Sequence, residues 1–378
     1  MKFTKKTMLM IFAITVLLMG VLSYRASSSA DISKRDLQER VQVIFQSRAS
    51  ASVTGSDPEK ALSYYDTTTM LGRWALEHEK SKLKYIQLWS QKRGVNIIEA
   101  NSTIKIPWSQ VVGDNAELTV DQTLQLGYVY QDDPTVNRFG IGTRHWMKLT
   151  LKNGKWFILQ DFYTDGLGDN SLALDPIPSD GPAVVKKNEH TNSAASSAPS
   201  LLNREGTVKY ADEFAGLAWG AGNDNQYNIR YRDYNDQGGD CTNFVSQCLG
   251  DQEGGRLPMD DNWFYNLNEG AGSQAWVRAE TFGDWLVYSG WGQRLARGTF
   301  QELNTPGEKY PRGAVRELQK GDVIGYGKIG YSAHMAIVVG YDSKGYPLVN
   351  SHNVDRYHCP WDMGYDKSTI YHLYKFGG

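Results

Sequence analysis

The first part of the chain changes from helical to strand-like spacing of its hydrophobic residues. In "SKRDLQERVQVIFQSRA" the apolar residues fall close to one helical face, and a second helical stretch ends at Gly94. Apolar and polar residues then alternate in "AELTVDQTLQLGYVY" and "TRHWMKLTLKNGKWFILQDFYT", where "KNGK" is a strong signal for a β-hairpin. Helices followed by an antiparallel meander predict a smaller α+β accessory domain over residues 31–164.

A second domain is expected because 378 residues exceed one ordinary hydrophobic core. Residues 165–204 are dominated by Gly, Asn, Ser, Asp and Pro and include "TNSAASSAPS", which predicts a flexible linker. Residues 205–378 begin with helical segments and end with three predicted strands, "KGDVIGY", "AHMAIVVGY" and "YPLVNSH". This order predicts another α+β domain with a different topology.

The N-terminus has the order of an export signal. Lysines at positions 2, 5 and 6 precede the apolar run 8–22, and "SYRASSSA" supplies small residues after it. Residues 1–30 are therefore predicted to be a cleaved signal peptide or an N-terminal anchor, with membrane anchoring through residues 8–22 in the second case. Either reading places the remaining chain outside the cytoplasm, secreted or associated with the cell wall.

Composition narrows the range of functions. The net charge of −2 and the absence of a basic block argue against binding to nucleic acid. Neither CxxC nor HExxH occurs, so no metal and no cofactor are expected. Three cysteines in an exported chain leave at least one thiol free, although Cys359 could form a disulfide with Cys241 or Cys248.

One of these cysteines, Cys241, occupies a position suited to a nucleophile. In "GGDCTNFVSQCLG" the apolar residues form one helical stripe, Asp240 is a favoured N-cap type, and Cys241 lies in the first turn. The helix dipole and the unpaired backbone N–H groups there lower the pKa of a thiol and can hold an oxyanion. The alternative is a small buried residue, which is our reading of Cys248.

A thiol nucleophile needs a base, and His334 opens the strand "HMAIVVGY". Asn350 and His352 share one face of the next strand, where a third polar group could fix the base's tautomer. The length of the turn decides whether they also share the face of His334. A longer turn would place Ser351 and Asn353 there instead.

These segments together resemble the bacterial putative amidase domain family, a relative of NlpC-type and papain-like cell-wall cysteine hydrolases. "GGDCTNFVSQCL", "KGDVIGY", "HMAIVVGY" and "LVNSHNVDRYHCPW" carry the resemblance over about residues 210–361. It implies a papain-like α+β core with Cys241 as nucleophile, His334 as general base, and His352 or Asn350 as the third residue. The accessory domain loosely resembles the cone-shaped folds of the nuclear transport factor two-like class.

The predicted function is an exported cysteine-dependent amidase or peptidase whose substrate is a peptide or peptidoglycan amide. A thiolate–imidazolium pair of Cys241 and His334 is expected to form a thioester with the substrate. Two alternatives remain open at this point. One is a non-catalytic cell-wall binding or scaffold protein with a degenerate hydrolase fold, and the other is a thiol acyltransferase.

Overall fold

The computed structural model describes residues 34–167, 174–176 and 202–377. The predicted signal or anchor at 1–30 and most of the predicted linker at 165–204 lie outside the described residues. Among the described helices, none is long and apolar enough to cross a membrane. The fold is mixed α and β, with N-terminal helices followed by antiparallel strands, as predicted.

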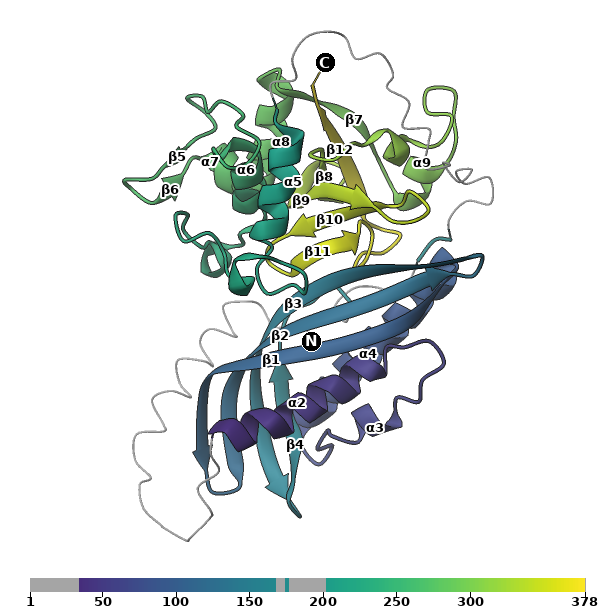
Figure 1. Ribbon diagram of the computed structural model, residues 1–378, viewed down its shortest axis with the longest axis vertical. Helices are drawn as coiled ribbons and strands as arrows, with labels where there is room; N and C mark the ends of the chain where they lie inside the picture. The colour runs from purple at the N-terminus through teal and green to yellow at the C-terminus, as the bar shows by residue number, and fades with distance from the viewer. Residues whose placement is uncertain (1–33, 168–173, 177–201, 378) are drawn as a thin grey trace.

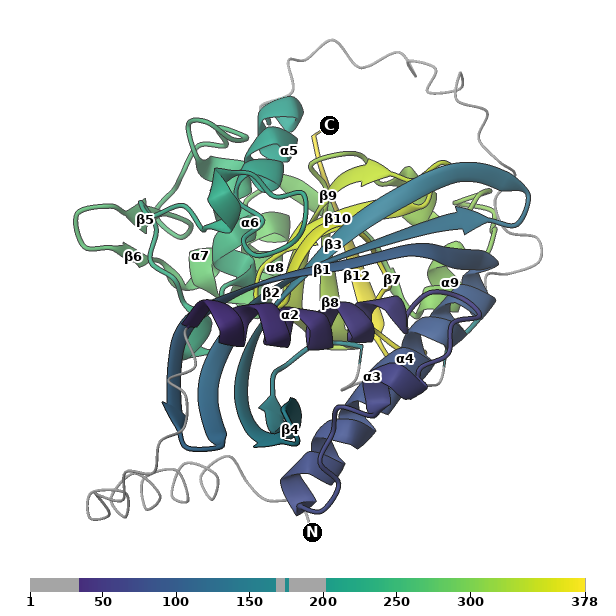
Figure 2. The same ribbon diagram turned by 60° about the horizontal axis from the view of Figure 1, so that its bottom comes forward.

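The N-terminal part consists of helices laid against a long, curved meander (Figures 1 and 2). Its elements are α2 (Lys34–Ser50), α3 (Glu59–Leu62), α4 (Met70–Arg93), β1 (Val95–Val112), β2 (Asn115–Tyr130), β3 (Asp133–Lys152) and β4 (Lys155–Phe162). The predicted hairpin is confirmed, because Lys152 pairs with Lys155. The two residues between this pair, Asn153 and Gly154, have φ angles of 51° and 76°. Positive φ at both central residues is the requirement of a tight hairpin turn.

Helix α2 protects the edge strand β1 through a row of glutamines. The side chains of Gln38, Gln42 and Gln46 lie four residues apart on one face and donate to backbone carbonyls of β1. The side-chain oxygens of Gln42 and Gln46 also accept backbone N–H groups of the same strand. These bonds occupy backbone groups that an open sheet edge would otherwise offer to another chain.

The C-terminal part places helices on both faces of a second group of strands. Its main elements are α5 (Arg204–Glu213), α6 (Cys241–Gly250), α7 (Gln274–Val277), α8 (Ala279–Tyr288), β7 (Gly292–Gly298), α9 (Phe300–Asn304), β8 (Val323–Lys328), β9 (Tyr331–Tyr341), β10 (Pro347–Ser351), β11 (Asp355–Pro360) and β12 (Ile370–Phe376), with a small hairpin of β5 (Tyr265–Asn266) and β6 (Ala271–Gly272). The three predicted strands are β8, β9 and β10, and they pair antiparallel.

The two parts share one ten-stranded sheet, which the sequence did not predict. The strand order is β1-β2-β3-β11-β10-β9-β8-β12-β7, with β4 beside β3. The joint is the antiparallel pairing of residues 140–142 of β3 with residues 355–357 of β11 (Figure 1). Gly140 and Gly142 let the 217–219 loop pack against β3 at this joint, because a Cβ on either would come within 2.5 Å of that loop.

A buried polar contact reinforces this joint. The carboxylate of Asp362 accepts from Arg93 Nε at 2.9 Å and from the Trp89 indole, and both partners lie on α4. The Tyr85 hydroxyl donates to the carbonyl of Tyr365 at 2.7 Å and accepts from the Gly364 N–H at 2.9 Å. Helix α4 therefore fixes the segment that follows β11.

We predict that Asp362→Ala lowers the free energy of unfolding by about 3–5 kcal/mol, because the Arg93 guanidinium would remain buried without its carboxylate. Urea denaturation measures this. The matched control is Asp132→Ala, which removes an exposed ion pair to Lys344 across the same joint and should leave stability unchanged. Equal effects of the two variants would contradict the importance of the buried pair.

Candidate functional site

Cys241 is the first residue of α6, as predicted, and its side chain is buried, with 5% of its surface exposed. The apolar stripe packs into the core of the C-terminal part against β9: Phe244, Val245, Cys248 and Leu249. All three cysteines are free. The disulfide considered for Cys359 is therefore absent, and Cys359 lies in a different core cluster beside Met363 and Tyr85.

The surroundings of the sulfur hold Cys241 as a neutral thiol. Burial raises the pKa of the thiol above its ordinary value, while hydrogen bonds from the backbone N–H of Met335 and from the Thr242 side chain act in the opposite direction. The Thr242 hydroxyl lies 3.7 Å from the sulfur. The predicted lowering of the thiol pKa was wrong, because desolvation outweighs the helix terminus at a site this enclosed.

Asp240 does not cap α6. Its carboxylate accepts from the Tyr234 N–H at 3.0 Å and the Asn243 amide at 2.8 Å, and its second oxygen lies 2.6 Å from His352 Nδ1. No side-chain capping bond forms. The predicted cap was wrong because a buried histidine competes for the same carboxylate, and the first-turn N–H groups stay uncapped as a result.

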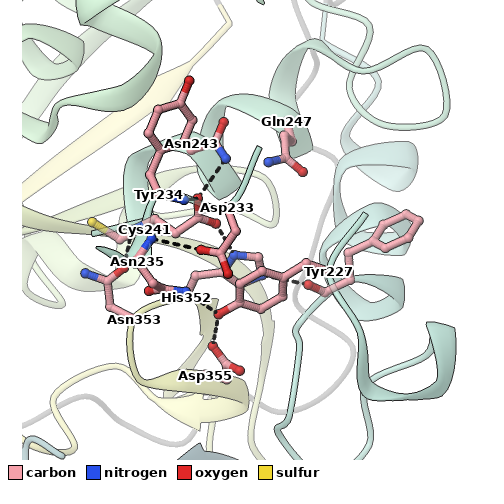
Figure 3. Close-up of polar contacts among 12 residues, drawn as sticks. Tyr227, Asp233, Tyr234, Asn235, Cys241, Asn243, Gln247, His352, Asn353 and Asp355 are labelled. Carbon is pink, nitrogen blue, oxygen red and sulfur yellow. Dashed lines mark hydrogen bonds and ion pairs between the residues drawn. The ribbon is translucent and has the colours of Figure 1, made fainter. Parts of the chain in front are cut away.

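His352 is fully enclosed and both ring nitrogens have partners (Figure 3). Nδ1 meets Asp240, and Nε2 lies 2.7 Å from the carbonyl oxygen of Phe214. The ring is stacked between Tyr227 at 3.7 Å and Phe244 at 3.9 Å. Oxygen atoms of other residues thus occupy both ring nitrogens. The ring therefore has no free nitrogen with which to orient His334.

The register of β9 and β10 answers the question that the sequence left open. Val349 pairs with Val338 and Asn350 with Ile337, after a bulge at Leu348. Asn350 thus shares the face of Ile337, not that of His334. Its amide donates to the Ala211 carbonyl and the Asp212 carboxylate, and its oxygen accepts from the His358 N–H. Asn350 joins α5 to the sheet.

His334 lies on the opposite face of β9, where its ring approaches Tyr326 (5.6 Å between centroids) and Tyr365 (6.5 Å). No hydrogen bond joins the ring to any residue that the structure describes, so its nitrogens are available. Burial, together with the charges of Arg356 and His352, lowers the pKa of His334 to about 3. These pKa directions favour a neutral thiol and a neutral imidazole over the expected thiolate–imidazolium pair.

Cys241 and His334 belong to adjoining positions in the fold. Met335, whose N–H bonds to the sulfur, is the residue after His334, and Tyr365 interacts with both side chains. The structure thus brings the predicted nucleophile next to the strand that carries the predicted base. Among the described residues, no hydrogen bond joins the Cys241 and His334 side chains, and neither His352 nor Asn350 is in hydrogen-bond contact with His334.

Two residues near the site were not singled out from the sequence. Asn353 has φ 82° and its side-chain oxygen accepts from the Asp240 N–H, directly before Cys241 (Figure 3). Tyr227 stacks on His352 while its hydroxyl donates to Asp355 at 2.5 Å. The alternative register, with Ser351 and Asn353, was the only sequence signal for Asn353. Tyr227 lies in a loop with no pattern to mark it.

Two large cavities lie away from these side chains. One of about 780 Å³ lies beside α5 and is lined by charged residues, among them Lys209 and Asp212. The other, of about 590 Å³, lies between α4 and the 51–58 loop. Neither is lined by Cys241 or His334. Among the described residues, no cluster of three or more His, Cys, Asp or Glu side chains could hold a metal.

Comparison with known proteins supports the reading of the C-terminal part. Residues 202–374 match the family described as putative amidase domain. This confirms the resemblance found in the sequence. The chain is also 32% identical over 176 residues to the uncharacterized protein YhbB of Bacillus subtilis (strain 168), over 45% of this chain and 46% of the relative. The chain thus matches about half the length of that relative.

A solved structure, the intermembrane space region of the chloroplast protein ARC6, aligns with 36% of this chain and 98% of its own length. The identity is 14% and the TM-score is 0.24.

We predict that the alkylation rate of Cys241 by iodoacetamide rises with pH beyond the ordinary thiol range, because burial raises its pKa and fewer molecules carry the thiolate at neutral pH. Mass spectrometry of the labelled peptide separates Cys241 from Cys248 and Cys359. A rate that is already constant between about pH 6 and 7 would indicate a stable ion pair with His334 and contradict the neutral pair.

Proposed function

We propose that the protein is an exported cysteine-dependent hydrolase that cleaves amide bonds of bacterial cell-wall peptides. The observation that carries the proposal is the contact between the Cys241 sulfur, at the uncapped start of α6, and the backbone of the strand that presents His334. The match to an amidase-type domain over residues 202–374 supports amide bonds as the target. The N-terminal apolar run 8–22 supports export.

The proposed reaction starts from the neutral pair. As the Cys241 sulfur attacks the carbonyl carbon and a C–S bond forms, the thiol proton moves to a nitrogen of His334. The carbonyl oxygen becomes an oxyanion, which the N–H of Cys241 at the helix start stabilises. His334 then gives its proton to the leaving amine as the C–N bond breaks.

The second half of the reaction removes the acyl group. His334 takes a proton from water, the hydroxide oxygen attacks the thioester, and the C–S bond breaks to release the carboxylic acid. The proton returns to the sulfur, which regenerates the thiol. Asp240 and His352 act in this scheme as positioning residues, because they hold the end of β10 against the first residue of α6 and leave its N–H groups uncapped.

A specific observation favours a second candidate, a cell-wall binding protein without catalysis. The thiol is buried, and the pKa of His334, lowered to about 3, makes it a weak base. A protein that only binds would tolerate both properties. Turnover of the substrate distinguishes the two candidates.

We predict that Cys241→Ala and His334→Gln each reduce release of peptide fragments from purified peptidoglycan by about 10³-fold or more, because each removes a partner of the proton transfer. Mass spectrometry of the digest identifies the bond that is cut. His358→Gln is the control: this histidine pairs with Asp212 of α5, outside the proposed proton transfer, and its substitution should leave the rate unchanged. Undigested peptidoglycan with the unmodified protein would favour the binding protein.

A further inference from the structure

Arg356, the second residue of β11, carries a buried positive charge without a carboxylate. The side chain is 4% exposed, and its Nε has no hydrogen-bond partner. No ion pair joins the guanidinium to any residue in the part of the chain that the structure describes. This differs from Arg48 and Arg93, which are equally buried and bond to Asp or Glu. A buried, uncompensated cation is costly to a fold.

The immediate surroundings of Arg356 leave its charge unneutralised. The groups that act most strongly on it are Tyr365, Cys359 and Tyr326. Burial raises the pKa of each of these three, so all are neutral at physiological pH. The guanidinium carbon lies 5.2 Å from the centre of the Tyr365 ring. A ring face attracts a cation weakly, but it does not replace an anion.

Two glycines let the backbone approach the end of the guanidinium closely. A Cβ added at Gly364 would come within 2.5 Å of Arg356 Nη2, and one added at Gly166 within 3.2 Å. Gly364 has φ 87°, which glycine adopts without strain. Glycine backbone, with no side chain of these two residues, therefore lies against the end of the guanidinium.

This cation lies beside the candidate catalytic pair. The Tyr365 ring that Arg356 contacts also stacks on Tyr326 at 4.2 Å and approaches His334 at 6.5 Å. The Arg356 charge opposes protonation of His334, second only to burial. A guanidinium presents a planar fork of N–H groups that fits a carboxylate with two parallel hydrogen bonds.

We propose that Arg356 binds a free carboxylate of the substrate close to the scissile amide and so selects anionic peptides. This inference rests on the proposed function for the identity of the scissile bond, but the anion site itself does not depend on turnover. A bound carboxylate compensates the guanidinium charge. It therefore also removes the second-largest contribution, after burial, to the lowered pKa of His334, so the correct substrate makes the base stronger.

The test measures binding without catalysis, in the full chain carrying Cys241→Ala. The probes are N-acetyl-alanyl-alanine, which has a free carboxylate, and its C-terminal carboxamide, which matches it in shape. Calorimetry should show about 10–100-fold tighter binding of the carboxylate, as expected for charge-assisted bonds. Adding Arg356→Met should abolish the difference. Adding Lys209→Met, which removes a cation from the cavity beside α5, should preserve it.

A stability measurement separates this role from a structural one. Without ligand, Arg356→Met should raise Tm, because it removes an uncompensated buried charge, whereas Arg93→Met should lower Tm by leaving Asp362 unpaired. Equal affinity for the two probes, a preference that survives Arg356→Met, or a fall in Tm like that of Arg93→Met would each overturn the proposal. Neither the binding nor the Tm measurement depends on hydrolysis. Both therefore remain interpretable if the protein does not digest peptidoglycan.

Discussion

The hydrogen bond between Asp240 and His352 is the contact on which the arrangement of the candidate site depends. It joins the residue before α6 to the end of β10, and it is buried between two aromatic rings. Because the carboxylate is used there, the first turn of α6 lacks a side-chain cap. The same contact therefore places Cys241 against β9 and keeps its N–H groups available for an oxyanion.

Enclosure of this site has opposing effects on catalysis. Removal of water strengthens every electrostatic interaction that a bound substrate could make. It also raises the pKa of the thiol and lowers that of the imidazole, which favours the neutral form of each. The uncompensated charge of the Arg356 guanidinium also contributes to the lowered pKa of His334. A negatively charged substrate would compensate the Arg356 charge and so remove its contribution to the lowered pKa of His334.

The accessory part of the chain contributes to the site through the sheet joint. Strand β3 pairs with β11, which carries Arg356, and α4 binds the segment that carries Tyr365. Arg356 and Tyr365, which both act on His334, are thus held by contacts with elements of the N-terminal part. The joint also contains the buried ion pair of Arg93 and Asp362. Such a pair fixes geometry more than it adds stability, because each charge must first lose its hydration.

Local patterns in the sequence were enough to predict the order of helices and antiparallel strands, the hairpin at Asn153–Gly154, and the position of Cys241 at the start of a helix. Spacing and turn residues decide such features within one element. The amidase-type resemblance was likewise carried by short motifs such as "DCTNFVSQ". Most of the remaining features depend on contacts between residues that are more than a hundred positions apart in the sequence. Only the tertiary structure could show that Asp240 turns to His352, that a bulge places Asn350 away from His334, that β3 joins β11, and that burial reverses the expected thiol pKa. Each of these depends on which groups compete for a partner and on how much water is excluded, and neither is encoded in the local spacing of residues.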